Sequence, residues 1–381
     1  MFGSDKKKKA VVQKTIDASL KSDRLGAGIQ KAVDERLQPD RLSAALHDLV
    51  AMLKPDGQPN INSLWLELKE LNAIKWSVKQ QGYAIGRQVF EHTKTLPVPD
   101  KPEAFLLDCK PSTQADVQAP WFVYWMDQLR SAPLPHRKLW EYAWILQNLH
   151  GHGKLAAGQR GLGFGCGTEP LPSYFANLGI DVVATDLAPE KVHGRGWAET
   201  GQHSASLDAI FEEKLASREA FDRHVSLHYV DMNDIPAEYD GQFDFCWSIC
   251  ALEHLGSIKN GLDFIEASLK TLKPGGVALH TTEFNYTETD RTTDNWQTVL
   301  FLRRHFEDLA KRLTEAGHQV APLDFDVGHE PLDCFVDLPP FEFDKFLTHV
   351  PDDLSYREGH LKMSVDGFPS TCFGIAVQKK A

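Results

Sequence analysis

The chain has 381 residues, of which 42% are hydrophobic and 25% are charged, a composition typical of globular proteins with a sizeable core. Its 41 Lys and Arg residues stand against 53 Asp and Glu residues, and the net charge of -12 argues against broad electrostatic binding of nucleic acid or anionic membranes. No early segment has the apolar core of a signal peptide, and no run approaches the roughly 20 apolar residues of a membrane span. The sequence therefore predicts a cytoplasmic protein without a membrane span.

Six cysteines are spread along the chain, without a Cys-x-x-Cys pair and without histidines at the spacing of a zinc site. This usage favours reduced thiols over disulfides and predicts no metal centre. A metal site built from His329, Asp333 and His360 is a weaker alternative, because their spacing does not require one.

The first part of the chain is predicted to be helical. Residues 10–95 carry leucines at helical spacing, with a break at Pro55-Asp56-Gly57. We expect the apolar stripe of these helices to be buried in the same chain or across a homo-oligomer. Several prolines between residues 96 and 120 indicate an irregular connector, so we predict an N-terminal helical extension and connector over 1–120 and a main domain over 121–381.

Residues 121–149 hold an unusual density of aromatic side chains, which Pro133 and Pro135 divide between two predicted helices. Aromatic residues at helical spacing are more often core than cofactor site. The second helix nevertheless directly precedes a glycine-rich turn, so Arg137 or Tyr142 could reach the carboxylate of a ligand.

A glycine-rich turn organises the rest of the chain. Gly163, Gly165 and Gly167, followed by Thr168 and Pro170, predict a strand-to-helix turn whose exposed N–H groups favour an anion or a carboxylate.

The next predicted strand, residues 180–186, ends in Asp186, which follows Gly165 by 21 positions. That is near the spacing at which a carboxylate at the end of a second parallel strand meets a nucleoside ribose. The sequence therefore predicts a nucleoside-cofactor site.

A third strand over residues 225–230 precedes Asp231 and Met232. An acid followed by an apolar residue at a strand end suits an adenine ring, although an Asp that caps the next helix is the alternative. The polar segment 189–220 is longer than the usual connection and is either a lid or an ordinary helix with a loop.

The apolar run over residues 243–250 predicts a central strand that is buried on both faces. It ends before Glu253 and His254. Further strands are expected over 277–282, 320–325 and 371–377, with amphipathic helices between them. This alternation predicts an α/β fold with a doubly wound, Rossmann-like, mostly parallel sheet of seven strands, which binds ligands at the carboxyl ends of its strands.

Residues 327–368 interrupt the hairpin expected at the edge of this sheet. They are too long and too aromatic for a plain turn. Together with residues 285–288 they are predicted to form the wall of an acceptor pocket.

These motifs, in this order and at these separations, resemble the class I S-adenosylmethionine-dependent methyltransferases over residues 137–285, with the last strands continuing to about 378. The turn after Leu272, Lys273-Pro274-Gly275-Gly276, belongs to the same pattern. Two positions depart from it, because Gly163 stands where the family commonly has an acid and Glu169 stands where it commonly has a third glycine. The candidates for the contacts of the missing acid are therefore Arg137, Tyr142 and Glu169.

The resemblance implies that S-adenosyl-L-methionine is the cofactor and that each of these motifs contributes to its binding. By similarity, Gly163, Gly165 and Gly167 leave room for its amino-acid half, Asp186 binds the ribose hydroxyls, Asp231 and Met232 flank the adenine, and Ser248 and Ile249 contact the methionyl amine through their backbone.

An oxygen acceptor must also lose its proton, whereas a carbon or amine acceptor needs less help. The candidate bases are His254, Glu253 and Glu283, and His254 is our first choice because imidazole titrates near neutrality. The alternative is that Glu253 caps the next helix and His254 is a structural residue of the turn.

The sequence thus predicts an enzyme that moves a methyl group to a small polar acceptor. A loose likeness to methyltransferases of bacterial glycan assembly favours a sugar hydroxyl. Two other classes stay open: a nicotinamide-dependent dehydrogenase, and an inactive methyltransferase-fold scaffold whose N-terminal helices bind a partner. The dehydrogenase has no need of Asp231-Met232, and a scaffold has no need of the acids at 186 and 231.

Overall fold

The computed structural model describes residues 61–188, 206–287, 289–339, 341 and 359–381. By its internal contacts the chain divides into two units, Met1–Trp76 and Ser77–Ala381, and the division falls within helix α4. The predicted domain boundary at residue 120 stays a prediction. Among the helices described, none is long and apolar enough to cross a membrane.

The helices of the described residues are bounded as follows. The α-helices are α4 (Ile61–Thr93), α5 (Gln114–Val117), α6 (Pro120–Gln128), α7 (Arg137–Gly151), α8 (Leu171–Asn177), α10 (Arg218–His224), α11 (Ile258–Thr271) and α12 (Arg303–Glu315). Short 3₁₀ helices are η2 (Leu207–Ile210), η3 (Ala237–Tyr239) and η4 (Leu252–His254). The predicted helical run that follows Pro55-Asp56-Gly57 is confirmed as α4, and the predicted helices before residue 61 lie outside the described residues.

The strands form one mixed sheet. They are β1 (Arg160–Phe164), β2 (Asp181–Asp186), β3 (Val225–Tyr229), β4 (Phe243–Ile249), β5 (Leu272–Asn285), β6 (Gln319–Val320), β7 (Val336–Asp337), β8 (Lys362–Val365) and β9 (Phe368–Gln378). Their order is β3-β2-β1-β4-β5-β9-β8-β7, and β6 also pairs with β9. The strands from β1 to β5 are parallel, while β9 runs antiparallel to β5. The predicted doubly wound, Rossmann-like, mostly parallel sheet is confirmed.

The predicted number of seven strands is wrong, because the described sheet has nine. The edge strand β9 is long, and β6 occupies only its end through the pairs Gln319↔Gln378 and Val320↔Val377. The rest of that edge is open to β8, which pairs Lys362 with Thr371 and Val365 with Phe368, and β7 then adds to β8. The two additional strands are therefore parts of the predicted insertion.

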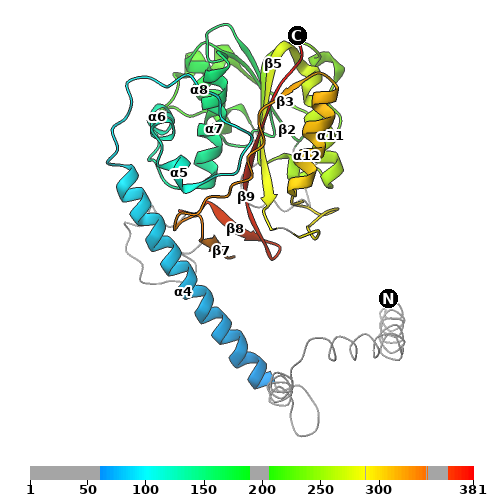
Figure 1. The fold of residues 1–381 in the computed structure, drawn as a ribbon. Helices are drawn as coiled ribbons and strands as arrows, with labels where there is room; N and C mark the ends of the chain where they lie inside the picture. The colour runs from blue at the N-terminus through cyan, green and yellow to red at the C-terminus, as the bar shows by residue number, and fades with distance from the viewer. Residues whose placement is uncertain (1–60, 189–205, 288, 340, 342–358) are drawn as a thin grey trace, which may run out of the picture. The chain divides into compact units, whose positions relative to one another are not determined.

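Helices cover both faces of the sheet, with α7 and α8 on one side and α11 and α12 on the other (Figure 1). The aromatic residues of α6 and α7 are core, as their spacing predicts: Trp125, Trp140 and Trp144 are fully buried. Their indole N–H groups are satisfied, since Trp140 donates to Asp116 and Trp125 to Gln147, each at 2.9 Å. This packing fixes α7, whose first turn lies beside the carboxyl ends of the strands.

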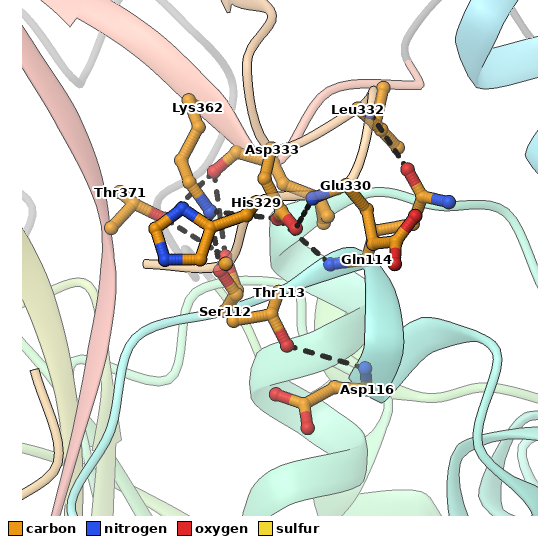
Figure 2. A network of polar contacts seen from close by, with 12 residues as sticks. Ser112, Thr113, Gln114, Asp116, His329, Glu330, Leu332, Asp333, Lys362 and Thr371 are labelled. Carbon is orange, nitrogen blue, oxygen red and sulfur yellow. Dashed lines mark hydrogen bonds and ion pairs between the residues drawn. The ribbon is translucent and has the colours of Figure 1, made fainter. Parts of the chain in front are cut away.

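The predicted insertion is attached to the rest of the unit by buried polar contacts, which Figure 2 shows from close by. The Lys362 side chain is completely buried, and its Nζ donates to the Ser112 carbonyl at 2.6 Å and pairs with Asp333 at 3.3 Å. The Asp333 carboxylate also accepts the backbone N–H of Gln114 at 2.9 Å. Burial lowers the pKa of Lys362, and Asp333 opposes that effect. These contacts thus join two parts of the insertion, Asp333 and β8, to the connector and α5.

A second buried ion pair joins the insertion to α4. Lys79 of α4 pairs with Asp337 of β7 at 2.6 Å, and both side chains are fully buried. Tyr83 donates to the other carboxylate oxygen at 2.8 Å, and the His360 ring lies 2.9 Å from it. Lys79 therefore joins α4 to β7, and Lys362 joins β8 to the connector at Ser112.

Replacing Lys362 by Met is predicted to lower the free energy of unfolding by about 3–5 kcal/mol, because it leaves the Asp333 charge buried without its partner. Urea unfolding followed by circular dichroism measures the change. The matched control is Lys311→Met, at an exposed position of α12, which should change stability by less than about 0.5 kcal/mol. A loss as small as that at Lys362 would contradict the assigned role of the pair.

Candidate active site

A cavity of about 660 Å³ opens at the carboxyl ends of the parallel strands. Its walls come from the turn after β1, the ends of β2 and β3, the segment after β4, the start of α7 and the end of β8. Ligands of doubly wound folds bind at this edge of the sheet. The cavity lies entirely within the unit Ser77–Ala381.

The structure brings most of the predicted site residues together in this cavity. Those that line it are Gly165, Gly167, Asp186, Asp231, Met232, Ile249, Glu253, His254 and Glu283. Two predicted cofactor residues, Gly163 and Ser248, are not among the lining residues, and the side chain of Ser248 bonds the ring of His280 at 2.8 Å inside the core. The roles assigned to all of these residues from the family pattern stay predictions.

Asp186 ties the glycine turn to the end of β2. Its carboxylate accepts the backbone N–H of Gly167 at 3.2 Å and that of Leu187 at 2.7 Å, and the residue is only 3% exposed. Gly165 has φ of 58°, and a Cβ there would lie 2.9 Å from the side chain of Ala251 and 3.4 Å from Met232 Sδ. A glycine is therefore required at 165 both by its backbone conformation and by the narrow space between two strand ends.

Two ion pairs lie at the cavity, and three of their four members, Arg137, Lys138 and Glu283, line it. Arg137 pairs with Glu283, whose second oxygen accepts the Ser370 hydroxyl at 2.6 Å. Burial lowers the pKa of Arg137, but Glu283 together with Cys372, Cys250 and Glu141 outweighs that effect, so the pKa is raised. Lys138 pairs with Glu141 at 3.3 Å, and Glu141 also accepts the Thr281 hydroxyl.

Glu253 and His254 differ in their surroundings although they are neighbours in the sequence. Glu253 is 1% exposed, accepts the Thr282 hydroxyl at 3.0 Å, and has a pKa raised by burial. His254 is half-buried, and its Nδ1 lies 2.9 Å from the carbonyl oxygen of Gln297. Because a carbonyl only accepts, Nδ1 carries the proton, and the neutral ring then holds its lone pair on Nε2.

Cys250 is a site residue that the sequence analysis missed. Its thiol lies 3.0 Å from Glu141, and the ligand atoms of Cys250, Glu253 and Glu283 lie within 4.8 Å of one another, as do those of Glu141, Cys250 and Cys372. Such groups are candidate metal sites by distance. Arg137 and Lys138 already balance Glu283 and Glu141, so the charges of these groups do not call for a cation.

Glu169 lies at the end of the glycine turn and is 6% exposed. It lines the cavity, and its Oε1 accepts the indole N–H of Trp247 at 2.5 Å. Burial raises the pKa of Glu169 to about 8. This carboxyl is therefore easily protonated in the cavity.

A second hollow of about 370 Å³ adjoins the cavity and shares His254 and Leu255 with it. Its remaining lining residues are Asn233, Gly256, Asn295, Trp296 and Gln297. Trp296 is 57% exposed, so an indole face stands beside three carboxamide residues next to His254.

The insertion contributes to the cavity through Pro339, Phe341 and residues 363–366, as the predicted acceptor wall requires. The weaker metal alternative is not supported by the contacts of its members, because Asp333 pairs with Lys362 and His360 with Asp337, while the His329 side chain is 89% exposed. The part of the predicted lid over 189–205 lies outside the described residues.

Residues 137–323 match the family whose description is "Methyltransferase domain". The chain is similar to the ubiquinone biosynthesis O-methyltransferase of Xanthomonas campestris, with 31% identity over 121 residues. That match covers 31% of this chain and 41% of the relative, so the chain spans about two fifths of the length of the relative.

Solved structures to which the chain is similar include an S-adenosylmethionine-dependent methyltransferase from Mesorhizobium loti, at 14% identity and a TM-score of 0.34 over 62% of this chain and 97% of that chain. Phosphoethanolamine N-methyltransferase 2 of Haemonchus contortus, solved with S-adenosyl-L-methionine, has 18% identity and a TM-score of 0.36 over 62% and 52% of the two chains. Neither likeness bears on the acceptor.

The raised pKa of Glu169 makes a prediction about stability. The native state holds this proton up to a pH of about 8, whereas the unfolded chain releases it near 4.5, so native stability is lost as the pH rises between these values. The free energy of unfolding of Glu169→Gln, relative to that of wild type, should therefore rise by on the order of a few kcal/mol from pH 5 to pH 8. Urea unfolding at both pH values measures this, with Glu213→Gln at an exposed position as the control. A difference that does not change with pH would contradict it.

Proposed function

The chain belongs to the class I S-adenosylmethionine-dependent methyltransferases through residues 137–323, and on that premise we propose that it methylates a hydroxyl group of a small polar acceptor. A sugar is our first candidate for that acceptor. The observation that carries the proposal is the meeting of Asp186, Asp231 and His254 in one cavity, because it joins a nucleoside site to a base.

The residues present fit the cofactor of this family. A buried carboxylate at the end of β2 suits the two hydroxyls of a ribose, and Asp231 with Met232 suits an adenine. Gly165 and Gly167 have φ of 58° and 52°, so the turn exposes backbone at the cavity without side chains. When bound, S-adenosylmethionine supplies a methyl group on a sulfonium and leaves as the neutral thioether S-adenosylhomocysteine.

The acceptor side of the cavity is rich in hydrogen-bonding groups. Glu283, which pairs with Arg137, and Glu253 can accept hydrogen bonds from hydroxyl groups, while the exposed Trp296 and its neighbouring carboxamides offer a flat face and polar edges that suit a sugar ring. The similarity to the Xanthomonas relative, which is an O-methyltransferase, also supports oxygen as the acceptor atom.

His254 is the base in this proposal. The Gln297 carbonyl orients the ring and fixes the proton on Nδ1, so Nε2 is the atom that takes the hydroxyl proton as the new oxygen–carbon bond forms. Glu253 next to it stabilises the imidazolium that results. The remaining acceleration comes from positioning, for which correct orientation of two reactants can supply about 7–11 kcal/mol.

Two further points stay predictions from the sequence. One is a cytoplasmic location. The other is a homo-oligomer formed through the N-terminal helices, for which the exposed Leu66, Leu71 and Ile74 of α4 provide apolar side chains.

Isothermal titration with S-adenosylhomocysteine tests the cofactor. We expect micromolar binding to wild type, no binding of NADH, and a loss of about 100-fold or more in Asp186→Ala, because the ribose loses a charged acceptor of two hydrogen bonds. Since Asp186 also holds the glycine turn, Asp231→Ala serves as a second variant. Absence of binding by the folded wild-type protein would refute an active methyltransferase and favour the scaffold.

His254→Ala should lower kcat by about 10²–10⁴ with little change in the affinity for S-adenosylhomocysteine. Sugars incubated with the protein and S-adenosylmethionine are first screened by mass spectrometry, and the variant is then assayed on the methylated one. His224→Ala, at the opposite end of β2 where His224 pairs with Asp181, is the matched control and should keep full activity. Equal activity of His254→Ala and wild type would exclude His254 as the base.

A further inference from the structure

Glu169 is a buried carboxyl group that the proposed mechanism does not use. It lines the cavity together with Gly167 and Tyr142, between the glycine turn and the start of α7. Asp231, Met232 and Leu187, which follow β3 and β2, line the same cavity. The carboxyl therefore belongs to the end of the site that lies beside the glycine turn and α7.

The position of this carboxyl depends on the glycine at residue 163. A Cβ at 163 would lie 2.4 Å from Cζ2 of Trp247 and 2.3 Å from the Cys166 sulfur, so the Trp247 ring fills the space that a side chain there would need. The same ring donates its N–H to Glu169 Oε1 at 2.5 Å. Residue 163 therefore cannot carry a carboxyl group. The carboxyl of Glu169, at the other end of the turn, is fixed beside the cavity instead.

We propose that Glu169 binds the α-ammonium group of the methionyl half of S-adenosylmethionine, an inference that rests on the proposed function. A carboxylate with one oxygen fixed by an indole can give the other to an ammonium donor, which makes a charge-assisted hydrogen bond. A purely structural Glu169 would only hold Trp247 in place.

The acid–base state of Glu169 agrees with this role. Burial raises its pKa, while Trp247 and Lys138 partly offset that effect. An ammonium group placed against the carboxyl stabilises the ionised form, so the ligand and the ionised carboxylate favour each other.

Titration of two ligands separates the two roles. S-adenosylhomocysteine carries the amino-acid half, whereas 5′-methylthioadenosine has the same nucleoside without it. Glu169→Gln should lower the affinity for S-adenosylhomocysteine about tenfold to 100-fold and should change the affinity for 5′-methylthioadenosine by less than about threefold. Retained binding of 5′-methylthioadenosine also shows that the variant is folded.

A second variant, Trp247→Phe, keeps the ring that packs on Gly163 and removes only the N–H that holds Glu169. It should lower the affinity for S-adenosylhomocysteine but not that for 5′-methylthioadenosine, and by less than Glu169→Gln does. Equal weakening of both ligands by Glu169→Gln, or no change in either, would overturn the proposal. If wild type binds neither ligand, the proposed function itself fails.

Discussion

The close packing of the Trp247 ring on the backbone of Gly163 is the constraint on which the cofactor end of the site depends. It allows no side chain at 163, and it places an indole N–H where the Glu169 carboxyl accepts it. The ring belongs to β4 and also packs on Phe175 of α8, with the ring centroids 5.2 Å apart. The strand, the helix after the turn and the carboxyl are therefore fixed by one residue, so a change at any of the three positions must be matched at the others.

The acceptor side depends on a different kind of contact. The insertion reaches the cavity through Pro339, Phe341 and the end of β8, and it is held by the buried pairs Lys79–Asp337 and Lys362–Asp333. Buried ion pairs contribute little net stability but are costly to break, and they require one geometry. They suit a wall that must keep its shape although it is built from short strands at the edge of a sheet.

The central fold could be predicted from the sequence because strand and helix patterns alternate along the chain, and Asp186, Asp231 and His254 lie at or shortly after the ends of β2, β3 and β4. The strand number could not be predicted, since β7 and β8 have two and four residues and depend on the free edge of β9. Nor could the pairing of Lys362 with Asp333 or the contacts of Cys250, because these partners are joined only by the tertiary fold.

In the proposed mechanism the carboxyls of Glu283, Glu141 and Glu253 do not compete with His254 for the role of base, since each is engaged differently. Glu283 pairs with Arg137 and Glu141 pairs with Lys138, so each of these carboxyls already has a cation as its partner. Glu253 is almost completely buried and accepts a hydroxyl from Thr282. His254 is half-buried and has one nitrogen fixed by a carbonyl. His254 also lines both the cavity and the hollow beside it, which is why the proposed mechanism assigns it the proton transfer.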